Sequence, residues 1–424
     1  MLAPEVKEKV QAVYRQLLEN RDLVPRYGQR QMIAEIAKSL ATINNNTVVE
    51  PPICVIEAGT GTGKTLAYIL AVVPLAKALE CKVVIATATV ALQEQVILKD
   101  IPEILSGCDL DFSFSLAKGR GRYVCLSRLD MLMRGSDSMQ AMIDLYGEEL
   151  DAPQGGDQAL YEKMLTELSA GDWEGDRDDW KEPIADDNWR PVTVDNNQCM
   201  GPKCSHFRNC CFYRARESMD RADCIVTNHD LVLADLSLGG GVILPDPADC
   251  IYIFDEAHHL PFKSNNHFSA FTRIKGNISW LERSENILLR LAKDKLVDTK
   301  QAETLQLLVG QTTESLEEAR DLLEHTLESL DSVDSYLNRA QHAFSLGVVP
   351  VEIKSVATNL AQQFMRLCAG FQDITDTLKN AMEEGVDLKL QQLTEQWFPI
   401  VGSFNKRAEA NLELWLSYSS TDPA

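Results

Sequence analysis

Residues 53–65 read Ile53-Cys54-Val55-Ile56-Glu57-Ala58-Gly59-Thr60-Gly61-Thr62-Gly63-Lys64-Thr65. The four apolar residues at the start predict a short buried strand, and Leu66–Leu79 predicts a helix after the glycines. A glycine-rich turn between a strand and a helix presents backbone N–H groups to phosphate. Ala58–Thr65 is therefore predicted to be a phosphate-binding loop, with Lys64 on the β- and γ-phosphates of a nucleotide and Thr65 on Mg²⁺.

A second motif joins an apolar strand to two carboxylates. Ile251–Phe254 precedes Asp255-Glu256-Ala257-His258, and the carboxyl end of a parallel strand is where ligands bind in such sheets. Taken alone, these four residues are also typical of a solvated loop. Together with the phosphate-binding loop they predict an ATP-hydrolysing site. There Asp255 holds Mg²⁺, Glu256 orients and deprotonates the attacking water, and His258 senses the nucleotide.

The rest of the N-terminal part alternates between helix and strand patterns. Apolar periodicity predicts helices at residues 5–19, 29–40 and 91–98, and strands at Lys82–Thr87 and Cys224–Thr227. This alternation predicts an α/β domain with a doubly wound parallel sheet.

Two segments depart from that alternation. Residues 112–222 are rich in Gly, Asp, Trp and Cys, and they predict an insertion between residues 1–111 and 223–260 of the α/β domain. Residues 261–424 are expected to be mainly helical. In that range leucines recur every seven residues (Leu316, Leu323, Leu330, Leu337), and the patterns at 351–382 and 405–416 are also helical.

Composition limits the classes of protein that are possible. The chain has 424 residues, of which 45 % are hydrophobic, which is enough for a sizeable core. It has neither a membrane-spanning apolar run nor an apolar signal core, so we expect a cytoplasmic protein with no membrane partner. In a reducing compartment its 11 cysteines are expected to be thiols or metal ligands.

The formal charge of −22 argues against a simple basic protein that coats DNA. The charge is unevenly distributed, because two basic clusters flank the acidic residues 137–190. They are Lys118, Arg120, Arg122, Arg128 and Arg134 in the first, and Lys203, Arg208, Arg214, Arg216 and Arg221 in the second. Ordinary surface charge is one interpretation. We favour two basic strips brought together by the cysteines that flank them.

Four cysteines have the spacing of a metal site. Cys125 is followed, after a long interval, by Cys199-x4-Cys204-x5-Cys210. Four thiolates suit either Zn²⁺ or a [4Fe–4S] cluster, and spacing alone does not choose between them. Cys211 is an alternative to Cys210. The cysteines in or beside predicted strands are expected to be buried apolar residues: Cys54, Cys81, Cys224 and Cys250.

The two nucleotide motifs resemble those of superfamily 2 helicases, and three short segments extend the resemblance. Arg26-Tyr27-Gly28-Gln29-Arg30-Gln31-Met32 resembles the Q motif, in which Gln29 would read adenine. Thr87-Ala88-Thr89-Val90-Ala91-Leu92-Gln93-Glu94-Gln95 resembles motif Ia, which holds single-stranded DNA phosphates. Thr227-Asn228-His229 resembles a segment of the XPD-like branch.

The position of the cysteines, behind Gly119-Arg120-Gly121-Arg122-Tyr123, resembles the DinG type within that branch. The resemblance implies a RecA-like P-loop motor domain, an inserted [4Fe–4S] domain and a helical arch domain over 261–424. It assigns Cys125, Cys199, Cys204 and Cys210 as the cluster ligands.

The DinG-type resemblance implies an ATP-dependent 5′→3′ DNA helicase that uses Mg²⁺ and acts in DNA repair or replication. Its expected partners are single-stranded and forked DNA, with R-loops and single-strand-binding protein as further candidates. Expected DNA contacts are Thr87, Thr89, Arg120 and Arg122, with Lys203 and Arg208 beside the cluster. Nearby aromatic side chains are expected to stack on bases or to pack in the core: Tyr123, Phe207, Phe212 and Tyr213.

Two family motifs are not found in residues 1–424: the Ser-Ala-Thr motif, and the Gln-x-x-Gly-Arg-x-x-Arg motif that carries the arginine finger. We therefore expect a truncated form that lacks the second motor domain, has an exposed sheet edge and does not unwind DNA alone. Two alternatives remain, which are a non-catalytic Fe–S fragment that binds DNA and a P-loop ATPase that remodels nucleoprotein without unwinding.

Overall fold

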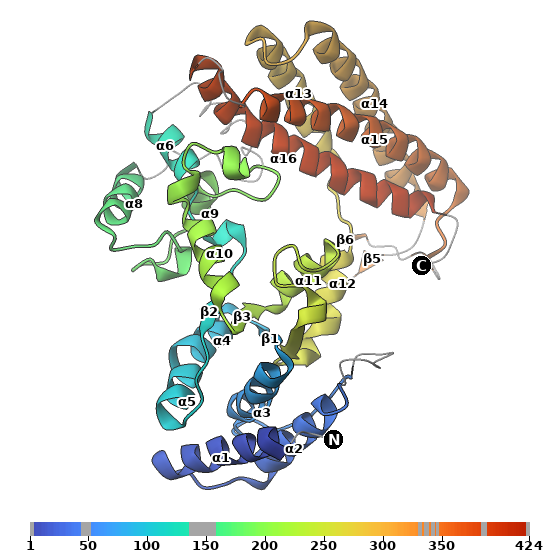
Figure 1. Cartoon of the computed structure of the whole chain (residues 1–424). Helices are drawn as coiled ribbons and strands as arrows, with labels where there is room; N and C mark the ends of the chain where they lie inside the picture. The colour runs from blue at the N-terminus through green and yellow to red at the C-terminus, as the bar shows by residue number, and fades with distance from the viewer. Residues whose placement is uncertain are drawn as a thin grey trace. The chain divides into compact units, whose positions relative to one another are not determined.

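The chain forms two compact units in a computed structural model (Figure 1). The structure describes residues 4–43, 52–134, 158–329, 333–334, 339–340, 344, 347–382 and 388–420. The first unit, here the sheet unit, comprises Met1–Gly119 and Tyr213–Ser269. The second, here the helical unit, comprises Arg120–Phe212 and Ala270–Ala424.

The sheet unit is built on four parallel strands in the order β2-β3-β1-β4. They are β1 (Lys82–Thr87), β2 (Phe114–Leu116), β3 (Cys224–Asn228) and β4 (Cys250–Phe254). The predicted α/β fold with a parallel sheet is confirmed. Because all strands run the same way, β1, β3 and β4 end at one edge, where Asp255 follows β4. Strand β2 belongs to this sheet although it lies within the range 112–222 that was expected to be an insertion.

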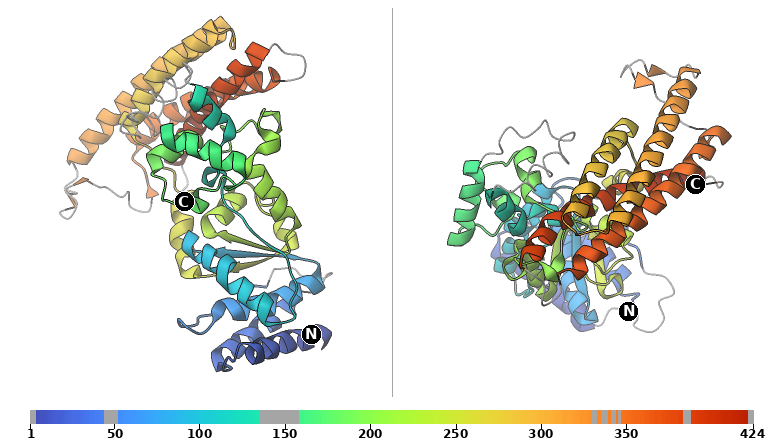
Figure 2. Two further views of the ribbon diagram at one scale, coloured as in Figure 1. Left: turned by 90° about the vertical axis from the view of Figure 1, so that its left-hand side faces the viewer. Right: turned by 90° about the horizontal axis from the view of Figure 1, so that it is seen from above.

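Helices pack on this sheet or on one another around it (Figure 2). They are α1 (Pro4–Asn20), α2 (Tyr27–Leu40), α3 (Lys64–Leu79), α4 (Val90–Gln95), α5 (Ile101–Gly107), α10 (Cys211–Arg221), α11 (His229–Ser237) and α12 (Leu260–Phe268). Helix α3 is apolar on all sides and is buried from Ala67 to Ala76, because it lies between the sheet and helices α1 and α2. The predicted helix at 91–98 begins as α4 and continues as a π-helical turn, η1 (Val96–Asp100).

The strand predicted at Ile53–Ile56 is wrong. No described strand includes these residues, and the side chains of Ile53 and Val55 are 85 % and 90 % exposed. Cys54 is exposed as well, so its predicted burial is also wrong. A strand needs a hydrogen-bonded neighbour. Strand β4 lies at an edge of the sheet, and among the described strands it pairs only with β1.

The helical unit has two kinds of structure. Its first part holds short helices: α6 (Leu126–Arg134), α8 (Gln158–Ala170), α9 (Asp186–Trp189) and the single turns Arg120–Arg122, Arg177–Asp179, Arg190–Val192, Gly201–Lys203 and Phe207–Asn209. Its second part holds four long helices: α13 (Ile274–Lys293), α14 (Thr299–Ser329), α15 (Val351–Asn380) and α16 (Leu388–Ser419). A two-stranded ribbon, β5 (Val333–Asp334) with β6 (Arg339–Ala340), lies between α14 and α15 in the sequence.

The long helices lie side by side (Figure 2) and share one core. Trp280 stacks on Phe404 at 5.4 Å between ring centroids, and Phe371 stacks on the same ring at 5.7 Å. The mainly helical character expected of this range agrees with the structure. Leu316 of the seven-residue repeat is buried, whereas Leu330 and Leu337 lie outside the described residues.

Within the helical unit, the segment that carries the late cysteines packs on α16. The ammonium group of Lys406 pairs with Asp195 at 2.9 Å, and the Asn197 amide donates to Glu409 at 3.3 Å. A Cβ at Gly402 would overlap the carbonyl oxygen of Asn197. A glycine is therefore needed for this close approach. Across the described part of the chain, none of the helices is long and apolar enough to span a membrane.

Candidate nucleotide site and cysteine cluster

The glycine-rich loop ends in a backbone conformation that only glycine adopts readily. Gly61 has φ 78° and Gly63 has φ 81°, and Gly63 is the residue before the first turn of α3. The hydroxyl of Thr62 donates to the carbonyl of Gly59 at 2.8 Å, which closes the turn. The loop therefore leads into the positive end of the helix dipole, where anions bind.

Lys64 and Glu256 lie in contact although they are distant in the sequence. The Lys64 Nζ atom is 2.8 Å from Glu256 Oε1, and the two side chains are 26 % and 30 % exposed. The hydrogen bond from Lys64 lowers the pKa of Glu256, and the same bond raises the pKa of Lys64. A charged pair thus lies where the loop meets the end of β4.

Glu256 itself has unusual backbone geometry. Its φ is 53°, in the left-handed region that non-glycine residues rarely adopt. Its second carboxylate oxygen lies 3.3 Å from Nδ1 of the exposed His258. Such strained positions cluster at functional sites, and here the turn directs the carboxylate toward Lys64.

Asp255 is fixed by neighbours on all sides. Its N–H donates to the carbonyl of Ala86 at 2.8 Å, and its carboxylate accepts from the N–H of Glu256 at 3.0 Å. The other carboxylate oxygen accepts from the buried hydroxyl of Tyr68 at 3.3 Å. Burial, and then the charge of Asp255, raises the pKa of Tyr68. Nε2 of the buried His229, which follows the predicted Thr227-Asn228 segment, contacts the Asp255 carbonyl at 2.9 Å.

Thr65 has two neighbours that the sequence did not reveal. Its hydroxyl lies near Asp100 and Tyr68, where it lowers the pKa of each. Burial raises the pKa of Asp100, and the Thr65 hydroxyl partly offsets that rise. Asp100 ends the π-helical turn η1, and such turns occur often at functional sites. The helix predicted at residues 91–98 ends before Asp100, so only the fold identifies this residue.

Gln29 lies against the loop with both ends of its amide engaged. Nε2 donates to the carbonyl of Gly63 at 3.3 Å, and Oε1 accepts from the hydroxyl of Tyr14 at 3.0 Å. The side chain of Gln29 is only 6 % exposed. The predicted site residue thus contacts the phosphate-binding loop, and Tyr14 is a neighbour that the sequence analysis missed.

The two threonines expected to touch DNA differ in exposure. Thr87 is fully buried, and its hydroxyl donates to the carbonyl of Thr89 at 3.0 Å. Thr89 is exposed and caps α4 by accepting from the N–H of Leu92 at 3.3 Å. Only Thr89 is accessible to a phosphate in this structure.

The four predicted metal ligands lie in the helical unit, and neighbouring cysteines contribute to the pKa shifts of Cys125 and Cys204. Burial raises the pKa of Cys125 to about 11, and the nearby Cys199 and Cys210 thiols add to the rise. Burial likewise raises the pKa of Cys204 to about 12, with Cys125 and Cys199 contributing. Even so, among the described residues no three His, Cys, Asp or Glu side chains are close enough together to hold a metal ion.

Cys210 and Cys211, the two candidates for the last predicted metal ligand, have different surroundings in the structure. The side chain of Cys211 is 2 % exposed and packs against Gly175, whose φ of 88° and lack of a Cβ make room for it. Cys210 is half-buried and lies near Cys125. This placement favours Cys210 as the member of the cysteine group.

The arginines expected to contact DNA have partners inside the helical unit. Nη1 of Arg120 donates to the sulfur of Cys199 at 2.8 Å, and its guanidinium lies 4.1 Å from the ring centre of Phe212. Arg122 donates from Nε to Asp178 at 3.1 Å. Tyr123 and Phe212 are both buried and meet edge to face at 5.9 Å. These two rings therefore pack in the core.

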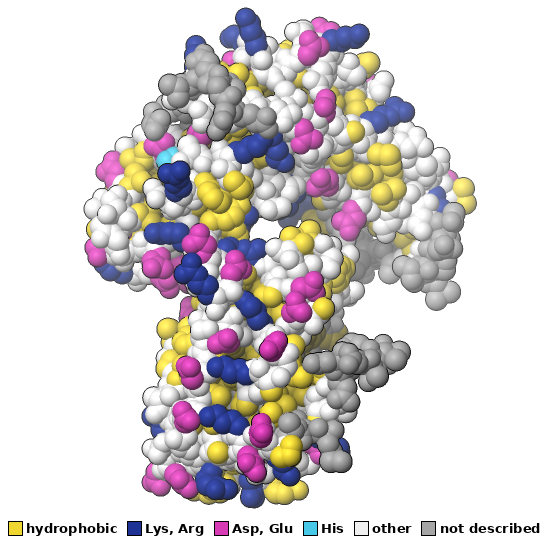
Figure 3. Space-filling view, in the orientation of Figure 1, with side chains coloured by type: hydrophobic (Ala, Val, Ile, Leu, Met, Phe, Trp, Pro, Cys, Tyr) yellow, Lys and Arg dark blue, Asp and Glu magenta, His cyan; other side chains and the backbone are white. Residues whose placement is uncertain are grey.

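The first basic strip is not a surface strip as expected. Lys118 is 8 % exposed and Arg128 is 1 % exposed, and the side chain of Arg134 lies outside the described residues. On the face shown in Figure 3, Lys and Arg side chains are interspersed with Asp and Glu side chains. Position in the sequence did not reveal that two of the cations are buried.

The structure is that of an α/β protein with a parallel sheet. Its glycine-rich loop precedes α3, and Lys64 lies against Glu256, an arrangement that resembles a P-loop nucleotide site. No protein-family model matches the chain. It is similar to proteins named ATP-dependent DNA helicase DinG, at 34 % identity over 417 residues in Photobacterium profundum and 29 % over 426 residues in Escherichia coli (strain K12). A third, from Salmonella typhimurium, is 29 % identical over 429 residues.

The chain is DinG-like over 98 % of its length. It spans 58 % of the length of the Photobacterium protein and 56 % of the length of the other two.

Proposed function

We propose that the chain binds ATP and Mg²⁺ at Ala58–Thr65 and hydrolyses ATP to drive a DNA helicase of the DinG type. The observation that carries the proposal is the 2.8 Å contact between Lys64 and Glu256, which unites two motifs that are 192 residues apart. The similarity to proteins named DinG supports the same conclusion independently.

The ion pair suggests how hydrolysis begins. A triphosphate at the N-terminus of α3 competes with Glu256 for Lys64, because both are anions. Once Lys64 turns to the phosphates, Glu256 loses the partner that lowers its pKa and becomes a stronger base. Glu256 then takes a proton from water, the water oxygen bonds to the γ-phosphorus, and the bond to ADP breaks.

Thr65 and Asp255 are the residues that would hold Mg²⁺, and oxygen donors of these two kinds suit that ion. When bound, the ion neutralises charge on the phosphates. Tyr68 donates to Asp255, and both Tyr68 and Asp100 lie near Thr65, so the two are placed to orient the donors. Neither Tyr68 nor Asp100 needs to touch the nucleotide for this role.

The test of nucleotide binding is a titration of the 424-residue chain with ATP and Mg²⁺. Lys64→Ala should weaken binding at least about 10-fold, because it removes the ammonium group that bonds the phosphates. Lys38→Ala removes an exposed lysine of α2 and is the matched control. Equal affinity in wild type and Lys64→Ala would exclude this site.

We propose that Cys125, Cys199, Cys204 and Cys210 bind a [4Fe–4S] cluster, in an inserted domain within 112–222. The raised pKa values of Cys125 and Cys204 mean that without a metal these thiols stay protonated, and a bound metal favours the thiolate form. Four thiols from one segment fit the donor set of such a cluster, and they also fit zinc.

Metal analysis separates these outcomes. The chain purified without oxygen should contain iron and acid-labile sulfide and should be brown. Cys204→Ser should lose the iron, whereas Cys211→Ser should keep it because Cys211 packs against Gly175. Zinc in place of iron, or equal loss from both variants, would contradict the assignment.

We also propose that residues 1–111 and 223–260 form a motor domain and 261–424 an arch domain, in a protein that unwinds DNA in the 5′→3′ direction. Thr89, exposed at the start of α4, is the residue we expect to meet a DNA phosphate. Thr89→Ala should weaken single-stranded DNA binding without changing ATP affinity. A protein that remodels nucleoprotein instead would hydrolyse ATP on DNA but fail to separate strands.

A further inference from the structure

The peptide group that joins Asp255 to Glu256 is held at both of its ends. Its carbonyl oxygen lies 2.9 Å from Nε2 of His229, and its N–H donates to the Asp255 carboxylate at 3.0 Å. The next torsion along the chain is φ of Glu256, which is 53°. The orientation of this one peptide group therefore decides where both carboxylates of the candidate site lie.

His229 reaches this peptide group from another strand of the sheet. It follows β3 directly as the first residue of α11, and its fully buried ring lies 5.9 Å from the ring of Phe254 between centroids. Strands β3 and β4 lie on either side of β1. The contact with Asp255 therefore joins the ends of two strands that do not pair with each other in the described sheet.

The chemistry of this contact fixes the proton on the ring. A backbone carbonyl only accepts hydrogen bonds, so Nε2 of His229 carries a proton and donates it. Nδ1 is buried and has no hydrogen-bond partner among the described residues. Burial lowers the pKa of His229, so the ring is neutral at neutral pH. The donor at Nε2 is therefore what the side chain contributes to the site.

We propose that His229 is a positioning residue that fixes the Asp255–Glu256 peptide group, so that the Asp255 carboxylate faces the Mg²⁺ position and the Glu256 carboxylate faces Lys64. The proposal rests on the proposed ATP site and deepens it by naming a residue that acts through the backbone. A left-handed φ is unfavourable for glutamate. Without the bond from His229 this strain favours rotation of the peptide group, which withdraws the Glu256 N–H from the Asp255 carboxylate.

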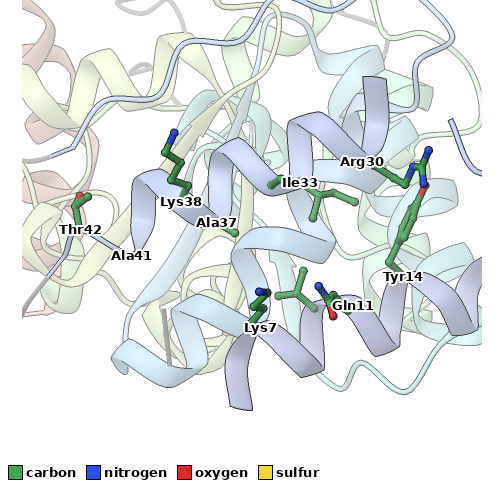
Figure 4. A pocket seen from close by; sticks show the side chains of 11 residues that line it. Lys7, Gln11, Tyr14, Arg30, Ile33, Ala37, Lys38, Ala41 and Thr42 are labelled. Atoms are coloured by element: carbon green, nitrogen blue, oxygen red, sulfur yellow. The ribbon is translucent and has the colours of Figure 1, made fainter. Parts of the chain in front are cut away.

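Two amide substitutions separate the hydrogen bond from the rest of the side chain. In His229→Gln the amide nitrogen reaches the place of Nε2, whereas the shorter amide of His229→Asn reaches only the place of Nδ1. His229→Asn should therefore lose the bond and His229→Gln should keep it. Gln11→Asn is a control that shortens an exposed amide side chain on α1, where Gln11 lines an open pocket of about 560 Å³ between α1 and α2 (Figure 4).

The first measurement is hydrogen exchange of the 424-residue chain without nucleotide, followed by mass spectrometry. Exchange of the amides at 255–259 should be about 2- to 10-fold faster in His229→Asn, the factor for one hydrogen bond. It should stay at the wild-type rate in His229→Gln and Gln11→Asn. Asp235→Ala removes a buried carboxylate from the same helix. It is the control for a general loss of stability and should not raise exchange selectively at 255–259.

The second measurement compares ATP affinity in Mg²⁺ with ATP affinity in EDTA. The gain in affinity that Mg²⁺ provides should be about 2- to 10-fold smaller in His229→Asn than in wild type, because the Asp255 carboxylate is no longer held in place. Affinity in EDTA depends on Lys64 and should be unchanged. A merely structural role of His229 would lower the melting temperature and leave the gain from Mg²⁺ intact.

Three results would overturn the role of His229. One is unchanged exchange at 255–259 in His229→Asn. Another is equal behaviour of His229→Gln and His229→Asn. The last is a lower melting temperature in His229→Asn with the gain from Mg²⁺ intact. Absence of ATP binding in wild type would instead refute the proposed ATP site, and the exchange measurement would still decide whether His229 holds the peptide group.

Discussion

Replacing Glu256 by glutamine should make the chain bind ATP more tightly while it stops hydrolysing it. Lys64 is paired with Glu256 at 2.8 Å. Phosphate binding must open that pair, so part of the binding energy is used to break it. Glu256→Gln keeps the shape of the side chain but removes the charge that holds Lys64.

The size of the effect follows from the exposure of the pair. With side chains 26 % and 30 % exposed, such a pair contributes about 1 kcal/mol or less. Removing that competition corresponds to a gain in ATP affinity of up to about fivefold. Loss of the general base should reduce hydrolysis by about 100-fold or more.

The pH range in which Glu256→Gln gains ATP affinity follows from the directions of two pKa shifts. The pKa of Glu256 lies below its ordinary value of 4.5, and that of Lys64 lies above its ordinary value of 10.5. The contribution of the pair to stability is lost as pH falls through the first pKa or rises through the second. The affinity gain should therefore be constant from about pH 6 to about pH 9.

Calorimetric titration of ATP and Mg²⁺ into wild type and Glu256→Gln measures this gain directly. Glu282→Gln, on α13 in the helical unit, is a matched control that should leave affinity unchanged. Weaker ATP binding in Glu256→Gln would mean that Glu256 contributes to binding and does not compete for Lys64, and the reasoning would be refuted.

Three further substitutions probe backbone and core. Gly63→Ala should abolish nucleotide binding, measured by titration, because φ is 81° and the new Cβ overlaps Gln29. Asp235→Ala should lower the free energy of unfolding by about 3 kcal/mol or more in denaturant titration, since the buried carboxylate accepts four backbone N–H groups. Gly402→Ala should lower the melting temperature and expose the chain near Asn197 to proteases, because the new Cβ overlaps that residue's carbonyl.

Each of these changes has a matched control. Gly310→Ala places a Cβ in open space on α14 and should be neutral or stabilising. Asp230→Ala removes an exposed carboxylate of α11 and should cost far less than Asp235→Ala. A Gly402→Ala variant as stable as Gly310→Ala would contradict the close approach at Asn197.

Local sequence patterns predicted those elements of the sheet unit that are buried between neighbouring elements. Strand β1 was predicted at its observed bounds, Lys82–Thr87, because a β-branched run between two other strands is buried on both faces. The apolar run Ile53–Ile56 carries the same pattern. Residues 53–55 are exposed because pairing depends on a neighbouring strand that the pattern cannot show.

The sequence predicted the candidate site only in part, because the surroundings of several site residues depend on segments that are distant in the sequence. Asp100 lies at the end of a π-helical turn near Thr65, which the sequence pattern does not show. Thr87 matches a DNA-contact motif, yet the end of β1 turns its hydroxyl inward. Cys210 and Cys211 are adjacent in the sequence, and it is packing against Gly175 that separates their surroundings.

The most direct test of the account is a crystal structure of the 424-residue chain with Mg²⁺ and a non-hydrolysable ATP analogue. We predict the triphosphate at the N-terminus of α3, the Lys64 ammonium group on its β- and γ-phosphates, and the Glu256 carboxylate released toward the γ-phosphorus. An analogue bound elsewhere, or a Lys64–Glu256 pair still closed beside a bound triphosphate, would contradict it.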